Sequence, residues 1–119
     1  MHKLSVASTF YNSEDTIIDF IKTILSTIKK LNISEYEIIL VNDGSKDSSI
    51  DKILDNYKNE NIKIINLSKN FGHHQATMTA YKYCSGDFVF FIDSDLEVDP
   101  SVLEDLWNNS SDCDLIYAK

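Results

Sequence analysis

Apolar residues recur along the chain at two different spacings, and each spacing predicts a different element. After Glu14 they return at steps of four and three, a spacing that places one apolar face on a helix. The residues on this stripe are Ile17, Ile21, Ile24, Ile28 and Leu31. A second stripe predicts a second helix, with Asp47 or a nearby Ser able to cap its start. Its residues are Ile50, Ile53, Leu54 and Tyr57.

Short apolar runs between these stripes predict strands. They cover residues 4–8, 36–41, 62–67 and 88–92. The last run has no polar alternation, which is typical of a strand covered on both faces and makes it the best candidate for a central strand. Residues 114–118 predict the start of a fifth strand.

Two further helices are expected from small residues and turn signals. Residues 73–84 carry Ala76 and Ala80 one helical turn apart, which would allow close approach to a sheet, and Gly86 is expected to stop this helix. Asp99 precedes Pro100, an order that predicts an N-cap followed by the first helical position.

Alternation of strands and helices with short connections predicts an α/β fold, with a mostly parallel sheet and helices on both faces. We expect residues 1–119 to form a single domain, because the chain is 43% hydrophobic and contains no internal repeat or low-complexity linker.

Composition narrows the function classes. A formal net charge of -8 argues against binding to a nucleic-acid backbone, which requires clustered Lys and Arg. Cys84 and Cys113 form no disulfide framework or zinc motif, so we expect a reducing, cytoplasmic setting. No apolar run approaches the roughly 20 residues that span a bilayer, and the N-terminus lacks the features of a signal peptide. We therefore expect no transmembrane segment.

Three polar clusters follow predicted strands, where ligands of open α/β sheets gather. The cluster Asp93-Ser94-Asp95 follows five apolar residues directly. Two neighbouring carboxylates repel each other, and a hard cation such as Mg²⁺ or Mn²⁺ relieves that repulsion and can be shared with a ligand's phosphates. The alternative interpretation is a helix cap or a solvated turn.

The other two clusters are residues 9–12 and 42–45. Asp43 could accept a hydrogen bond from a ring N–H of a nucleotide base, and Gly44 would permit close backbone approach. Tyr11 could stack on that base, with Thr9 adding a polar contact. Ordinary turn residues would explain Asp43-Gly44-Ser45 equally well.

A loop over residues 69–72 precedes the third predicted helix, whose free N–H groups could hold an anion. Lys69 could also reach phosphate, although a simple helix start is the alternative. His73 and His74 are adjacent, so on a helix they point about 100° apart and are not expected to form a metal site. Asp87 is expected to satisfy a turn.

Five ordered pieces together resemble family 2 glycosyltransferases. They are S-T-F-Y-N-S-E-D at 8–15, I-L-V-N-D-G-S-K-D-S-S at 39–49, K-N-F-G at 69–72, S-G-D at 85–87 and D-S-D-L at 93–96. The motif style is similar to polyprenyl-phosphate sugar synthases and related bacterial sugar transferases. Glu97 stands where those synthases often carry Gln, which leaves the acceptor class open.

The resemblance implies a Rossmann-like GT-A fold whose first half binds a nucleoside-diphosphate sugar. It implies that Thr9, Tyr11, Asp43, Ser45, Lys69 and Asp93 contact the nucleotide, and that Asp93 and Asp95 hold Mg²⁺ or Mn²⁺. The acceptor would be a glycan or a lipid-linked carrier, reached at the cytoplasmic face of a membrane in the second case. The general base and acceptor half of the family are expected beyond Lys119.

Two other function classes stay open. One is a binding module of the same fold without catalysis. The other is a receiver-like or phosphoryl-transfer protein that uses an acidic cluster with Mg²⁺. The chain has no P-loop, and Gly44, Gly72 and Gly86 do not form G-x-G-x-x-G, which disfavours the last class.

Overall fold

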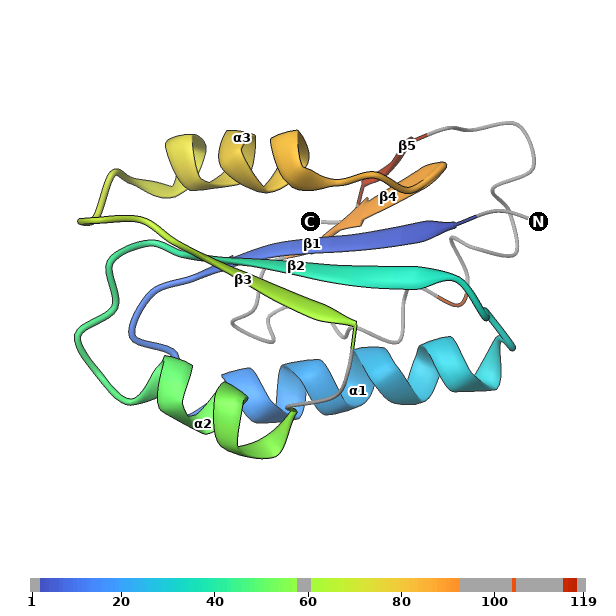
Figure 1. The fold of residues 1–119 in the computed structure, drawn as a ribbon, viewed down its shortest axis with the longest axis horizontal. Helices are drawn as coiled ribbons and strands as arrows, with labels where there is room; N and C mark the ends of the chain where they lie inside the picture. Colours follow the sequence, from blue (N-terminus) through green and yellow to red (C-terminus); the bar gives the residue numbers. More distant parts are fainter. Residues whose placement is uncertain (1–2, 58–60, 93–103, 105–114, 118–119) are drawn as a thin grey trace.

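The computed structural model describes residues 3–57, 61–92, 104 and 115–117. Strands and helices alternate along the chain (Figure 1). The strands are β1 (Leu4–Phe10), β2 (Tyr36–Asn42), β3 (Ile62–Asn66), β4 (Phe88–Phe91) and β5 (Leu115–Tyr117). The helices are α1 (Ile17–Lys30), α2 (Ser49–Asn56) and α3 (His73–Tyr83).

These strands form one sheet in the order β3-β2-β1-β4-β5, and every pair is parallel. The predicted α/β fold with a parallel sheet is therefore confirmed. β1 occupies the centre, whereas β4, the strand expected there, lies one place further out between β1 and β5. The helix predicted after Asp99 lies outside the described residues, apart from Glu104.

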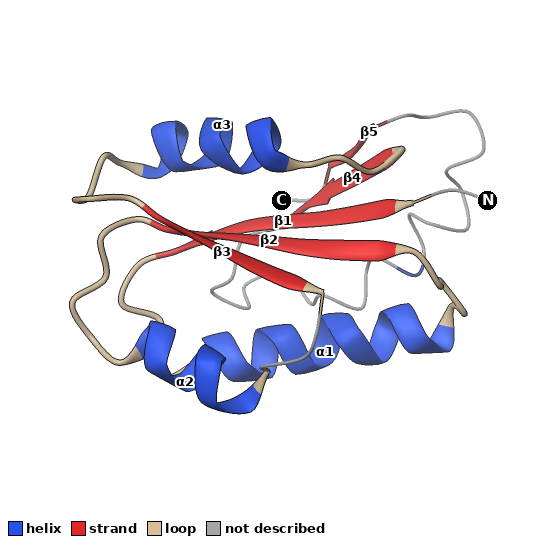
Figure 2. Cartoon of the chain, viewed as in Figure 1, coloured by secondary structure: helices blue, strands red, loops and turns tan. Residues whose placement is uncertain are grey.

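Helices cover both faces of the sheet, as Figure 2 shows, with α1 and α2 on one face and α3 on the other. The larger apolar cluster joins the α1 stripe to alternate strand residues such as Val6, Leu40 and Phe90. The second cluster, under α3, joins Ala76 and Ala80 to residues of β1, β2 and β4. No helix in the described part of the chain is long and apolar enough to cross a membrane.

Two local expectations were wrong. Leu54, placed on the apolar stripe of the second helix, is 51% exposed, because Ile53, with Ile50 and Tyr57, supplies the contact with the core. Gly86 does not end α3, which stops at Tyr83. A Cβ at Gly86 would lie 2.6 Å from Ser5 Oγ and 2.8 Å from Lys3 O, so glycine is required there by close packing against β1. Asp87, expected to satisfy a turn, instead accepts a hydrogen bond from the distant Lys3 amide at 2.8 Å and ties the start of β4 to the residue before β1.

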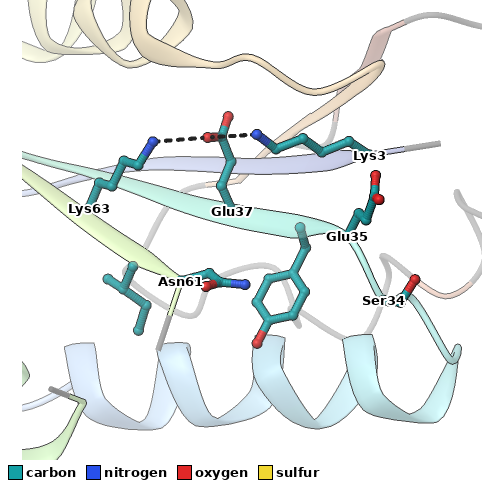
Figure 3. Close-up of a pocket in the computed structure, with 8 residues that line it drawn as sticks. Lys3, Ser34, Glu35, Glu37, Asn61 and Lys63 are labelled. Atoms are coloured by element: carbon teal, nitrogen blue, oxygen red, sulfur yellow. Dashed lines mark ion pairs between the residues drawn. The ribbon is translucent and has the colours of Figure 1, made fainter. Parts of the chain in front are cut away.

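Glu37 is a buried carboxylate at the amino edge of the sheet, with only 3% of its side chain exposed. Its Oε2 accepts hydrogen bonds from Ser5 Oγ and from the Ser85 amide, both at 2.6 Å. The ammonium groups of Lys3 and Lys63 each lie 3.5 Å from Oε1 (Figure 3). The cluster ties β1, β2 and β3 to the turn before β4.

These contacts stabilise the charged form of Glu37. Burial alone would raise the pKa of Glu37, but hydrogen bonds from Ser5 and Ser85 and the charge of Lys3 outweigh it and lower the pKa from 4.5 to about 2. Burial, together with the negative charge of Glu37, raises the pKa of the free Cys84 thiol to about 11. Cys84 is thus protonated at neutral pH and a poor nucleophile.

The Glu37 cluster forms one wall of an open hollow of about 610 Å³, which is also lined by Glu35, Tyr36 and Asn61 (Figure 3). All of these residues lie where strands begin. The hollow is therefore at the edge opposite the polar clusters that follow the strands.

Replacing Glu37 by Gln should remove a pH-dependent part of the folding stability. Because its pKa is lower in the folded state, the Glu37 carboxylate contributes fully above about pH 4.5, and this contribution is lost as the pH falls towards 2. The shift corresponds to about 3 kcal/mol. Urea unfolding at pH 7 and pH 3 should show a smaller pH difference in Glu37→Gln than in the wild type.

Glu35→Gln is the matched control, because Glu35 is exposed and lies two residues away. It should unfold like the wild type at both pH values. Equal pH dependence of Glu37→Gln and the wild type would show that Glu37 does not supply this stability.

Candidate functional site

The carboxyl ends of β1, β2 and β3 lie in one row. Phe10 pairs with Asn42, and Asn42 pairs with Asn66. Asn42 Nδ2 donates to Asn66 Oδ1 at 3.1 Å, while Asn42 Oδ1 accepts the Ser45 amide at 2.9 Å. The loops after these strands therefore emerge side by side at one edge of the sheet.

Asp43 is the buried polar residue at the centre of this edge, with 5% exposure. Its amide donates to Phe10 O at 2.9 Å, and its Oδ1 accepts the Phe71 amide at 2.8 Å. No hydrogen bond to its other carboxylate oxygen is found within the described residues. Asp43 thus connects the end of β1 with the loop after β3 and keeps one oxygen able to accept a hydrogen bond from a ligand.

The loop after β1 presents Tyr11, whose side chain is 45% exposed. Asn12, the next residue, has a left-handed backbone with φ of 49°. The Asn12 amide donates to Ser45 Oγ at 2.8 Å, and Asn12 Oδ1 accepts the Lys46 amide at 2.8 Å. The structure therefore brings Tyr11, Asp43 and Ser45 together on two loops that are bonded to each other.

The third loop carries Lys69 and packs against Gly44. A Cβ at Gly44 would lie 2.5 Å from the Asn70 backbone nitrogen. Lys69 Nζ lies 5.2 Å from the centre of the Phe71 ring, a cation–π contact. Phe71 is 48% exposed, so this loop adds a second exposed aromatic side chain and the ammonium group of Lys69 to the edge.

Thr9 lies just inside the edge, with 8% exposure. Its Oγ1 is 3.4 Å from His73 Nδ1, within hydrogen-bonding distance. The His73 ring meets Phe91 edge-on, with centroids 6.3 Å apart. Thr9 therefore links β1 to the first residue of α3, and its partner His73 is a contact that the sequence did not suggest.

Asparagine side chains hold the three loops, a role that sequence reasoning missed. They are Asn12, Asn42, Asn66 and Asn70, the last of which accepts the Gly72 amide at 2.9 Å. Their positions at strand ends were the available signal, because Asn commonly bonds nearby backbone in turns.

The predicted cation ligands Asp93 and Asp95 lie outside the described residues. Ile92, the residue before them, is fully buried, and its amide donates to Ala7 O at 3.1 Å. The chain therefore reaches Asp93 from the carboxyl end of β4. Within the described residues, no group of three or more His, Cys, Asp or Glu side chains could hold a metal ion.

Fold and loops together define a Rossmann-like α/β domain with its polar loops gathered at the carboxyl edge of a parallel sheet. The model of glycosyl transferase family 2 matches residues 5–117, so the chain belongs to that family. The resemblance drawn from the sequence motifs is confirmed.

Named relatives and solved structures agree with this assignment. The chain is 35% identical over 103 residues to an undecaprenyl-phosphate 4-deoxy-4-formamido-L-arabinose transferase of Proteus mirabilis, covering 84% of this chain and 31% of the relative. S. aureus TarS 1-349 matches with a TM-score of 0.71 at 29% identity, covering 91% of this chain and 32% of that fragment. The same TarS fragment was also solved with UDP-GlcNAc.

A more distant structure confirms the GT-A fold. It is the mannosyltransferase PcManGT of Pyrobaculum calidifontis, solved with GDP-Man and Mn²⁺. Its TM-score is 0.77 at 17% identity, covering 94% of this chain and 33% of PcManGT. The chain spans about a third of the length of the curated relatives that it matches.

Gly44→Ala should destabilise the protein more than Gly72→Ala. Both glycines have positive φ, 80° and 97°, so both substitutions strain the backbone by about 1–3 kcal/mol. Only Gly44 also faces backbone atoms of the neighbouring loop, which adds a further overlap of about 1–3 kcal/mol. Urea unfolding measures the difference.

Gly72 is the matched control because a Cβ placed there would have no atom within 4 Å. Equal losses of stability in the two variants would contradict the close contact between the loops.

Proposed function

We propose that this protein is the donor-binding domain of a metal-dependent glycosyltransferase, which transfers a sugar from a nucleoside-diphosphate sugar to an acceptor. Residues 1–119 would act as one domain in this role. The observation that carries the proposal is the arrangement at Asp43, where three loops meet at the ligand-binding edge of a domain of this family.

The base of the nucleotide would lie between Tyr11 and Asp43. A carboxylate oxygen that accepts a hydrogen bond from a ring N–H selects a base that carries such a donor. The Tyr11 ring, 45% exposed, offers a flat apolar surface for stacking. Because Asp43 is held by its amide and by Oδ1, its remaining oxygen keeps a fixed direction.

Ser45, Lys69 and Thr9 would complete the nucleotide contacts. Ser45 Oγ already accepts the Asn12 amide, so its hydroxyl proton is the group left to donate to a ligand oxygen. The cation–π contact of Lys69 is weak enough for a diphosphate to replace it. Thr9 is nearly buried and would support the pocket from beneath.

Asp93 and Asp95 are proposed as the ligands of Mg²⁺ or Mn²⁺, with Asp93 also facing the nucleotide. Their carboxylate oxygens are the hard donors that these ions prefer. When bound, such a cation would stabilise the negative charge that develops on the diphosphate leaving group. Ile92 brings the chain to the same edge as Asp43, which supports a shared site.

Uridine is the first candidate for the donor nucleoside, because TarS, 34% identical over the matched region, was solved with UDP-GlcNAc. A polyprenyl phosphate is the first candidate for the acceptor, because the Proteus relative is named for that carrier. We place such a reaction at the cytoplasmic face of a membrane, although a soluble glycan acceptor would serve the same donor site.

Asp95→Asn should weaken nucleotide binding in the presence of Mn²⁺ by at least about tenfold, since it removes a charged ligand of the cation. Isothermal titration with UDP, GDP and dTDP, with and without Mn²⁺, measures this effect. The same series identifies the base. Hydrolysis of the matching nucleoside-diphosphate sugar is measured in parallel. Release of the sugar indicates a catalytic chain, whereas binding without release indicates a donor-binding module.

Asp51→Asn is the matched control, since Asp51 is exposed on α2. It should leave binding unchanged. Unaltered Mn²⁺-dependent binding in Asp95→Asn would refute the cation site, and wild-type protein that binds none of the three nucleotides would refute the proposed function.

A further inference from the structure

Three consecutive amides of the loop after β1 donate hydrogen bonds to side chains of the loop after β2 and of the first residue of α2. The pairs are Asn12 to Ser45 Oγ at 2.8 Å, Ser13 to Ser49 Oγ at 2.9 Å and Glu14 to Asp47 Oδ2 at 3.1 Å. Asp47 Oδ1 in turn accepts the amide and hydroxyl of Ser49. The two loops therefore form one hydrogen-bonded unit.

Asp47 holds this unit as a carboxylate. Partial burial would raise its pKa, but hydrogen bonds from Ser49 and the Glu14 amide outweigh that effect and lower the pKa. Lys52 Nζ adds a hydrogen bond to Glu14 O at 3.1 Å. The far end of the unit, where α1 and α2 begin, is thus firmly connected.

Asn12 is the connection at the other end, directly after Tyr11. It is bonded in both directions, since its amide donates to Ser45 Oγ and its side chain accepts the Lys46 amide. Its φ of 49° is a conformation that few residues other than Gly, Asn and Asp adopt readily. The position thus requires both a left-handed backbone and a side-chain acceptor.

We propose that Asn12 is a positioning residue for nucleotide binding, which fixes Tyr11 relative to Asp43 before the ligand arrives. This inference rests on the proposed function, because Tyr11 and Asp43 are the residues assigned to the base. Lys46 lies three residues after Asp43, so the bond from its amide to Asn12 sets the separation of the two loops. A pocket ordered in advance avoids the entropic cost of ordering the loop on binding.

The chain contains a matched control for this position. Asn32 is the other non-glycine residue with positive φ in the described part of the chain, at 57°. It follows α1 at the opposite edge of the sheet, where its amide donates to Lys29 O at 3.1 Å. Asn→Gly at either position keeps the backbone conformation accessible and removes an amide side chain.

The test compares the wild type with Asn12→Gly and Asn32→Gly. Titration with UDP, GDP and dTDP in the presence of Mn²⁺ should show binding about tenfold weaker in Asn12→Gly, as expected for the loss of one loop-to-loop hydrogen bond and of prior order. Asn32→Gly should bind like the wild type. Thermal unfolding checks that both variants remain folded at the temperature of the titration.

Hydrogen exchange of the ligand-free protein provides a second measurement that does not depend on nucleotide. The amides of residues 12–14 and 46 should exchange faster in Asn12→Gly than in Asn32→Gly. The positioning role would be overturned if Asn12→Gly bound nucleotide as tightly as the wild type, or if its loop amides exchanged at the wild-type rate. Either result would count whatever the effect of the substitution on the melting temperature. Absence of binding in the wild type itself would instead refute the proposed function, and this inference with it.

Discussion

Parallel pairing of β1 with β2, and of β2 with β3, brings Phe10, Asn42 and Asn66 into one row. The side-by-side position of the three loops follows from that alignment. Because parallel strands all run in one direction, each one releases its following loop at the same edge. Residues far apart in the chain, such as Tyr11 and Phe71, can then contribute to one surface.

The aligned strand ends also create a problem that the loops have to solve. Beyond the ends of the strands, backbone N–H groups no longer bond to a neighbouring strand, so they need other acceptors when they are shielded from water. Side chains of Asp43, Ser45 and Asp47 accept amides from neighbouring loops, and Asn12 Oδ1 accepts the Lys46 amide. The residues that satisfy the backbone therefore also tie the loops to one another.

The two edges of the sheet use carboxylates in opposite ways. At the amino edge, Glu37 is saturated by hydroxyl, amide and ammonium groups, and its contribution is to stability. At the carboxyl edge, Asp43 has one oxygen engaged and one without a partner among the described residues. The difference decides their roles, because a fully bonded carboxylate has no acceptor capacity left for a ligand. The hollow beside Glu37 therefore presents no free oxygen of that carboxylate.

Periodicity predicted the described elements closely, because the apolar stripe of α1 and the apolar strand runs leave only one way to bury their side chains. Local signals failed at Leu54 and Gly86, where tertiary contacts decide. Ile53 is buried with Ile50 and Tyr57 packed against the same core, which leaves Leu54 exposed, and Ser5 and Lys3 fill the space beside Gly86.

Local sequence patterns were also insufficient at the candidate site. They predicted Asp43 and Ser45 as candidate ligand-binding residues, because turn residues there follow an apolar run. Asn12 was within the marked cluster, but its function depends on the Lys46 amide, which lies 34 residues away. Spacing along one strand or helix cannot reveal a bond between two loops, because that bond depends on the register of the strands that precede them. A positioning residue is therefore harder to find in a sequence than a ligand-binding one, and its contribution becomes visible only when the strand ends are placed side by side.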